Sequence, residues 1–118
     1  CILSYGPIMK RVFAVADRLE AAGRSVAIAS AHTLKPLDQA RIEQILADFE
    51  HVVVIEECAP NGSLSMRVEQ IAWKTRASCR LNTFTLQDEF KHCYGSHDDV
   101  LDEHGLAIPA ICAKLGLN

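Results

Sequence analysis

Residues 52–57 read Val-Val-Val-Ile-Glu-Glu, four β-branched residues followed by two acids. β-branched side chains are stiff and fit a pleated strand, and an apolar run without polar alternation fits a strand that is buried on both faces. Strands of this kind belong to parallel sheets, whose two faces are covered by helices. The segment therefore predicts the central strand of an α/β sheet.

The chain before this strand shows a strand and then a helix, twice. Residues 1–5 are apolar and end at Gly6-Pro7, which suits the start of a helix. The apolar stripe of that helix is formed by Met9, Val12, Phe13, Ala16 and Leu19. Gly23 supplies its C-terminal stop.

Residues 25–30 are short and apolar, which predicts a second strand buried on both faces. Asp38 is placed to cap the helix that follows. The apolar face of this second helix is formed by Ile42, Ile45, Leu46 and Phe49.

The chain after residue 57 continues the alternation. Residues 60–62 (Pro-Asn-Gly) mark a turn, and the helix after it has an apolar face formed by Leu64, Val68, Ile71 and Ala72. Residues 79–85 predict an edge strand. Ser96 is placed to cap a helix over residues 97–104 that stops at Gly105. A last helix places on one face Ile108, Ile111, Cys112 and Leu115.

Strands that alternate with helices generate right-handed βαβ units and a parallel sheet. We therefore expect residues 1–118 to form one domain, a three-layer α/β/α sandwich whose mainly parallel sheet has four or five strands. Ligands of such sheets gather at the carboxyl ends of the strands. Any functional site is expected there.

Composition narrows the classes of partner. The 118 residues carry a formal net charge of -3 with interspersed signs, so we expect no nucleic acid partner. Apolar runs are far shorter than the roughly 20 residues that cross a bilayer, so we expect no membrane span.

The five cysteines show no C-x-x-C spacing, which favours reduced thiols and a cytoplasmic location. Because the chain opens on Cys1 without a targeting segment, we expect a piece of a longer polypeptide.

Three residues at the predicted strand ends are candidates for chemistry. Gly6 precedes a helix and could bring backbone N–H groups to an anion, but the glycine fingerprints of phosphate loops are missing, so a plain turn is favoured. Glu56 and Glu57 close the central strand, where a carboxylate could act as a base. A structural interpretation is favoured, in which one glutamate binds backbone donors and the other meets solvent or a partner.

A second group of candidates consists of His92, Cys93, His97 and His104. Imidazole and thiolate are zinc ligands, but these spacings match no known site. His97 and His104 would stand two helical turns, or roughly 10 Å, apart, too far to share one metal. We therefore predict no catalytic, cofactor-binding or metal-binding residue. Met66 and Trp73 interrupt the polar side of their helix and are a candidate contact surface.

The order of motifs resembles the transketolase C-terminal domain family, which includes transketolases, deoxyxylulose-phosphate synthases and 2-oxoacid dehydrogenase beta subunits. The resemblance rests on residues 2–6 (Ile-Leu-Ser-Tyr-Gly), 19–23 (Leu-Glu-Ala-Ala-Gly), 33–38 (Thr-Leu-Lys-Pro-Leu-Asp) and 52–57, and on Asp88-Glu89-Phe90, Gly95-Ser96 and His104-Gly105-Leu106. Residues 33–38 are its most specific element.

This resemblance implies a non-catalytic assembly domain of a thiamine-diphosphate enzyme. In the family, thiamine diphosphate and a divalent metal such as Mg²⁺ lie between the pyrimidine-binding and pyrophosphate-binding domains of the parent, which is expected to be a homodimer. The family sheet usually has an extra antiparallel edge strand before the first strand seen here. Without it, the resemblance implies four parallel strands in the spatial order 2-1-3-4, with an open edge.

A self-standing binding module on the same architecture is the alternative. A receiver domain would need acids after its first strand, where this chain has Ser4-Tyr5-Gly6. A flavodoxin-like carrier would need a hydroxyl-rich phosphate loop there, and residues 7–9 (Pro-Ile-Met) do not form one.

Overall fold

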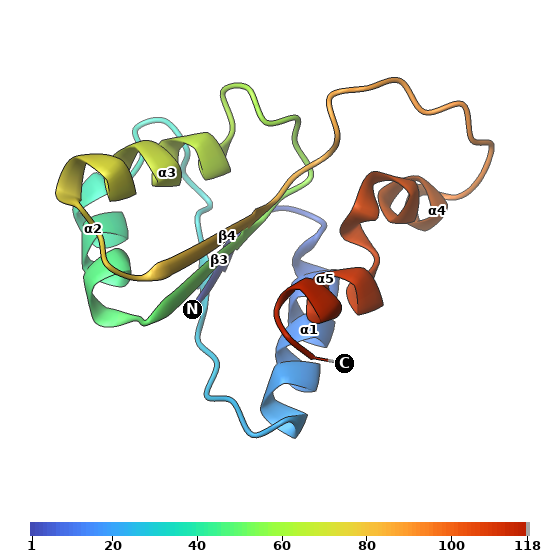
Figure 1. Cartoon of the computed structure of the whole chain (residues 1–118). Helices are drawn as coiled ribbons and strands as arrows, with labels where there is room; N and C mark the ends of the chain where they lie inside the picture. The colour runs from blue at the N-terminus through green and yellow to red at the C-terminus, as the bar shows by residue number, and fades with distance from the viewer. Residues whose placement is uncertain (118) are drawn as a thin grey trace.

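The computed structural model describes residues 1–117, and these contain one sheet between two layers of helices (Figure 1). The strands are β1 (Ile2–Ser4), β2 (Ile28–Ser30), β3 (His51–Ile55) and β4 (Arg80–Phe84). They lie in the order β2-β1-β3-β4, and every neighbouring pair is parallel. The predicted α/β/α sandwich and strand order are therefore confirmed, with four strands.

The helices divide between the two faces, as Figure 1 shows. α1 (Met9–Ala21) and α5 (Ile108–Lys114) pack on one face, against the side chains of Ile2, Val53 and Ile55. α2 (Gln39–Asp48) and α3 (Leu64–Thr75) pack on the other, against Leu3, Val52 and Val54. This division follows from the two-residue period of a strand, which turns successive side chains to opposite faces.

Local capping explains where three of the helices begin or end. Asp38 accepts a hydrogen bond from Arg41 N at 3.0 Å at the start of α2, as predicted. Ser63 Oγ accepts from Met66 N at 3.1 Å at the start of α3. Gly23 has φ 82°, a left-handed conformation that ends α1 and that glycine adopts without steric strain.

The buried stripe of α1 differs from the predicted one. Phe13 is 54% exposed, whereas Val15 and Arg11, which were not predicted, are buried. The stripe is centred on Val12, Val15, Ala16 and Leu19, so Phe13 falls at its margin. Periodicity locates the stripe, but its centre depends on what packs against the helix.

Two other segments differ from the prediction, and the strand expected over residues 25–30 is neither as long nor as buried as predicted. β2 covers only Ile28–Ser30, and these residues are half-buried or exposed because β2 is an edge strand with one neighbour. The helix predicted over 97–104 narrows to α4 (His97–Leu101) and continues as a wider turn, Asp102–Leu106. The predicted stop at Gly105 is confirmed, because this residue has a left-handed φ of 79°. No helix in residues 1–117 is long and apolar enough to cross a bilayer.

Candidate functional site

The carboxyl ends of β1 and β3 form the place where a ligand site is expected in this topology. The two strands are neighbours, yet β1 leads into α1 on one face and β3 leads into α3 on the other. Connections that diverge in this way open a crevice at the strand ends. The residues at this point are Tyr5 and Gly6 after β1, and Glu56 and Glu57 after β3.

Glu56 is completely buried and accepts three hydrogen bonds. Its Oε1 accepts from Ser65 N at 2.6 Å, and its Oε2 accepts from Leu64 N and from the Tyr5 hydroxyl, each at 3.1 Å. A helix N-terminus presents free N–H groups and a partial positive charge, both of which favour a carboxylate. Glu56 therefore holds the first turn of α3 against the end of β3.

The first turn of α3 has a partner for each of its first three N–H groups. Glu56 binds those of Leu64 and Ser65, and Ser63 Oγ binds that of Met66.

On the other side of Glu56, Tyr5 is held in its neutral form. Burial, together with the nearby charge and hydrogen bond of Glu56, raises the pKa of Tyr5 above its ordinary value.

Glu57 turns to the opposite face of the sheet, because consecutive residues of an extended strand alternate. Its Oε1 lies 2.5 Å from Nε2 of His97, the first residue of α4. Its Oε2 is buried and has no hydrogen-bond partner within residues 1–117. Glu57 thus ties β3 to α4, as Glu56 ties β3 to α3.

Chemically, this pair of acids acts as two structural ties. Both oxygens of Glu56 are occupied by donors of the chain itself, so proton abstraction by this carboxylate would release the start of α3. The prediction that one glutamate binds backbone donors is confirmed for Glu56. Gly6, with φ 74°, makes a turn whose carbonyl accepts Met9 N at 3.2 Å.

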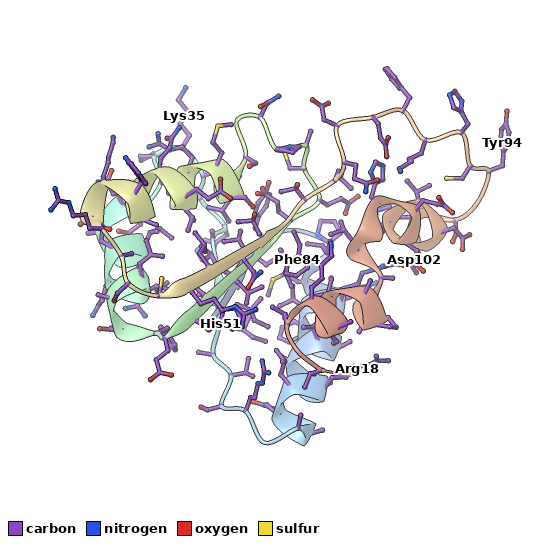
Figure 2. The ribbon with its side chains drawn as sticks, viewed as in Figure 1. Arg18, Lys35, His51, Phe84, Tyr94 and Asp102 are labelled. Atoms are coloured by element: carbon purple, nitrogen blue, oxygen red, sulfur yellow. The ribbon has the colours of Figure 1, made fainter. Side chains whose placement is uncertain are left out.

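The histidine and cysteine candidates do not come together. His97 pairs with Glu57, whereas His104 Nδ1 accepts from Gln87 N at 3.0 Å. His92 is exposed and Cys93 half-buried in the connection between β4 and α4. In the part of the chain that the structure describes, no group of three or more His, Cys, Asp or Glu side chains is placed to hold a metal ion. Figure 2 shows Tyr94 in the same connection, pointing away from the helices.

Arg11 is a structural residue that the sequence analysis missed. Its guanidinium lies 2.9 Å from Asp98 Oδ1 and 2.5 Å from Asp102 Oδ1, and it donates to the Leu106 carbonyl at 2.8 Å. Asp98 and Asp102 stand four residues apart, a spacing that puts both acids on one helical face. In the sequence, this spacing of two acids was the feature from which a basic residue packed against them could have been predicted.

Comparison with known proteins gives a consistent assignment. The family described as "Transketolase, C-terminal domain" matches residues 1–111. Curated relatives include 1-deoxy-D-xylulose-5-phosphate synthases from Chlorobium phaeovibrioides, 34% identical over 98% of this chain, and from Listeria monocytogenes, 30% identical over 97%. The chain covers 18% and 19% of these two proteins, less than a fifth of their length.

A solved structure agrees in fold. A chain described as "Split gene transketolase, inactive beta4 tetramer" superimposes with a TM-score of 0.79 at 21% sequence identity. The superposition covers 98% of this chain and 37% of that one.

Proposed function

The chain belongs to the transketolase C-terminal domain family, and on this premise we propose that it is a non-catalytic assembly domain of a larger enzyme. The larger enzyme depends on thiamine diphosphate and transfers two-carbon or acyl units, as the family resemblance implies. The chain's partners are the pyrimidine-binding and pyrophosphate-binding domains of that enzyme, which works as a homodimer in the cytoplasm. The five free cysteines are in keeping with that reducing compartment.

The observation that carries this proposal is the engagement of the carboxylates at the strand ends. A diphosphate bound through a divalent cation needs free oxygen ligands and donors for its phosphates. Glu56 is filled by two backbone N–H groups and the Tyr5 hydroxyl. Glu57 is paired with His97 through Oε1, which leaves its buried Oε2 as a single unpaired carboxylate oxygen among the described residues at these strand ends. These residues do not fit such a cofactor, so the proposal assigns the cofactor and Mg²⁺ to the rest of the enzyme.

Isothermal titration calorimetry with thiamine diphosphate and Mg²⁺ tests the assignment. We expect no heat of binding with the 118-residue chain and saturable binding with the larger enzyme that contains it. Binding by the 118-residue chain would contradict the proposal.

A truncation tests the assembly role separately. Removing this domain from the larger enzyme should raise its dimer dissociation constant, measured by analytical ultracentrifugation, and should lower activity mainly at low enzyme concentration. A truncated enzyme that keeps its full dimer and full activity would refute that role.

A further inference from the structure

We propose that the free edge of β4, together with the adjoining surface of α3, binds a second copy of this chain about a twofold axis. The two β4 strands pair antiparallel with Asn82 opposite Asn82 of the other copy. The inference rests on the assembly role proposed above and assigns a surface to it.

The outer edge of β4 offers unpaired backbone groups. Within residues 1–117, β4 pairs with β3 alone. Arg80 N donates to the Glu50 carbonyl at 2.8 Å, and the Phe84 carbonyl accepts from Glu56 N at 2.9 Å. Because alternate residues of a strand bond to the same neighbour, Arg80, Asn82 and Phe84 face β3. The N–H and C=O groups of Leu81 and Thr83 therefore point to the open edge.

This edge has few of the features that usually protect one. β4 has five residues, contains no proline and keeps an unbroken register with β3, and its one charged residue, Arg80, stands at its start, outside the residues 81–83 that would pair. Natural sheets commonly shorten, bulge or charge an edge strand to prevent pairing with another chain. The opposite edge of the sheet, β2, has only three residues. β4 is thus the better template for another strand.

The position of the free groups sets the register. In an antiparallel pair, two opposed residues exchange both hydrogen bonds at every second position. With Asn82 opposite Asn82, Leu81 exchanges both bonds with the partner's Thr83, and Thr83 does so with the partner's Leu81. This register uses all the free groups of residues 81 and 83, and it is symmetric, as a twofold interface must be.

The surface of α3 beside this edge is apolar at its centre. Trp73 is 86% exposed, and it borders a groove of about 630 Å³ that is also lined by Glu69, Arg76 and Leu81. Leu81 packs with the core on the α3 side of the sheet, and Thr83 Oγ1 donates to Glu69 Oε1 at 3.0 Å. The groove therefore runs along the pairing edge, and joining two β4 strands brings two α3 surfaces side by side.

The charges on this surface complement a second copy of itself. Glu69 precedes Trp73 by four residues and Arg76 follows it by three, so an acid and a base flank the indole. Glu69 is level with Thr83, which it binds, and Arg76 lines the groove near Leu81. Since Thr83 lies opposite the partner's Leu81, Glu69 faces the partner's Arg76. Opposite charges thus meet twice around the axis, which favours a second copy over an unrelated partner.

Sedimentation equilibrium of the 118-residue chain between roughly 1 and 200 μM, a range typical of weak dimers, is the test. We expect a concentration-dependent dimer. Glu69→Lys or Arg76→Glu alone places like charges together at two symmetric contacts, and each should raise the dissociation constant about tenfold. The double variant E69K/R76E restores opposite charges and should return the constant to about the wild-type value.

Two further variants separate this interface from general effects on folding. Arg67→Glu changes an exposed charge on α3, two residues and therefore roughly 200° around the helix from Glu69, and should leave the dimer unchanged. Thr83→Pro removes an N–H that points outward and spares the β3 ladder, so it should abolish the dimer while the circular dichroism spectrum stays folded.

A chain that stays monomeric over the whole range would overturn the proposal. So would a dimer that ignores the single charge reversals, or a double variant that does not recover. If the larger enzyme loses its dimer on removal of the domain but keeps it in E69K and R76E, the assembly role stands and this interface is wrong.

Discussion

Replacing Glu56 with glutamine should destabilise the fold far more than the same change at Glu57. Glu56 is completely buried and accepts three hydrogen bonds, two of them from the first backbone N–H groups of α3. Glutamine keeps the shape but has one acceptor oxygen in place of two, and its amide N–H₂ would face donors.

The magnitude follows from the bonds that are lost. A hydrogen bond to a charged group contributes about 1.5–3 kcal/mol, and a buried donor left without a partner costs about 1–3 kcal/mol. Removing the buried charge also relieves its desolvation, which offsets part of the loss. We therefore expect Glu56→Gln to lower the free energy of unfolding by about 2–4 kcal/mol, a large share of the roughly 5–15 kcal/mol of a typical domain.

Urea unfolding at pH 7 measures this difference. With a slope of about 2 kcal/mol/M, Glu56→Gln should lower the midpoint by about 1–2 M. Hydrogen exchange should show faster exchange of the Leu64 and Ser65 amides. Glu57→Gln is the matched control, because His97 is 58% exposed and a solvent-screened pair contributes only about 0–1 kcal/mol.

Two results would refute this reasoning. One is a loss below about 1 kcal/mol for Glu56→Gln, which would mean that the buried carboxylate does not hold α3. The other is an equal loss for Glu57→Gln, which would mean that the division between a buried and a half-buried acid has no energetic consequence.

Three other variants test the remaining polar contacts. Arg11→Met should lower the free energy of unfolding by about 1–3 kcal/mol and speed hydrogen exchange over residues 97–106, and unchanged exchange there would contradict the role of this guanidinium. Hydrogen bonds from Ser96 lower the pKa of Asp99 in the folded chain. The ionised Asp99 carboxylate therefore stabilises α4 above the pKa that it has in the unfolded chain, about 3.9, and this stabilisation is lost as the pH falls through the lower folded pKa. Asp99→Asn should remove this loss of stability at low pH. In an NMR pH titration, the chemical shift of the Ser96 amide should then no longer change in the acid range. The raised pKa of Tyr5 gives stability that is present below about pH 10 and declines as pH rises further. Tyr5→Phe should flatten this decline in urea unfolding between about pH 10 and 12, and identical curves for the two proteins would count against the burial of Tyr5 beside Glu56.

Features that depend on nearby residues were predictable from the sequence. The cap at Asp38 and the stop at Gly23 involve backbone groups within a few residues, so their chemistry is local. The strand at residues 52–55 and the helices around it follow from branching and periodicity. The handedness of βαβ crossovers then leaves few arrangements of the strands, which is why a parallel sheet could be expected.

The candidate site was only partly predictable. Two adjacent glutamates at a strand end must point to opposite faces, so the sequence implied two different environments. Which acid would be buried depended on the side of the sheet that α3 covers. His97 was considered as a metal ligand, and the fold instead brings it to Glu57, 40 residues earlier in the chain.

By itself, then, the sequence determined the α/β class, the helix caps and the strand succession, because these depend on short-range sterics and hydrogen bonding. The tertiary structure alone decided that Arg11 is buried while Phe13 is exposed, because acids from α4 and the turn after it reach Arg11 across about 90 residues. It also decided that β2 is a half-buried edge and that β4 presents an open edge beside Trp73. Burial is a property of what surrounds a residue, and those neighbours come from distant parts of the chain.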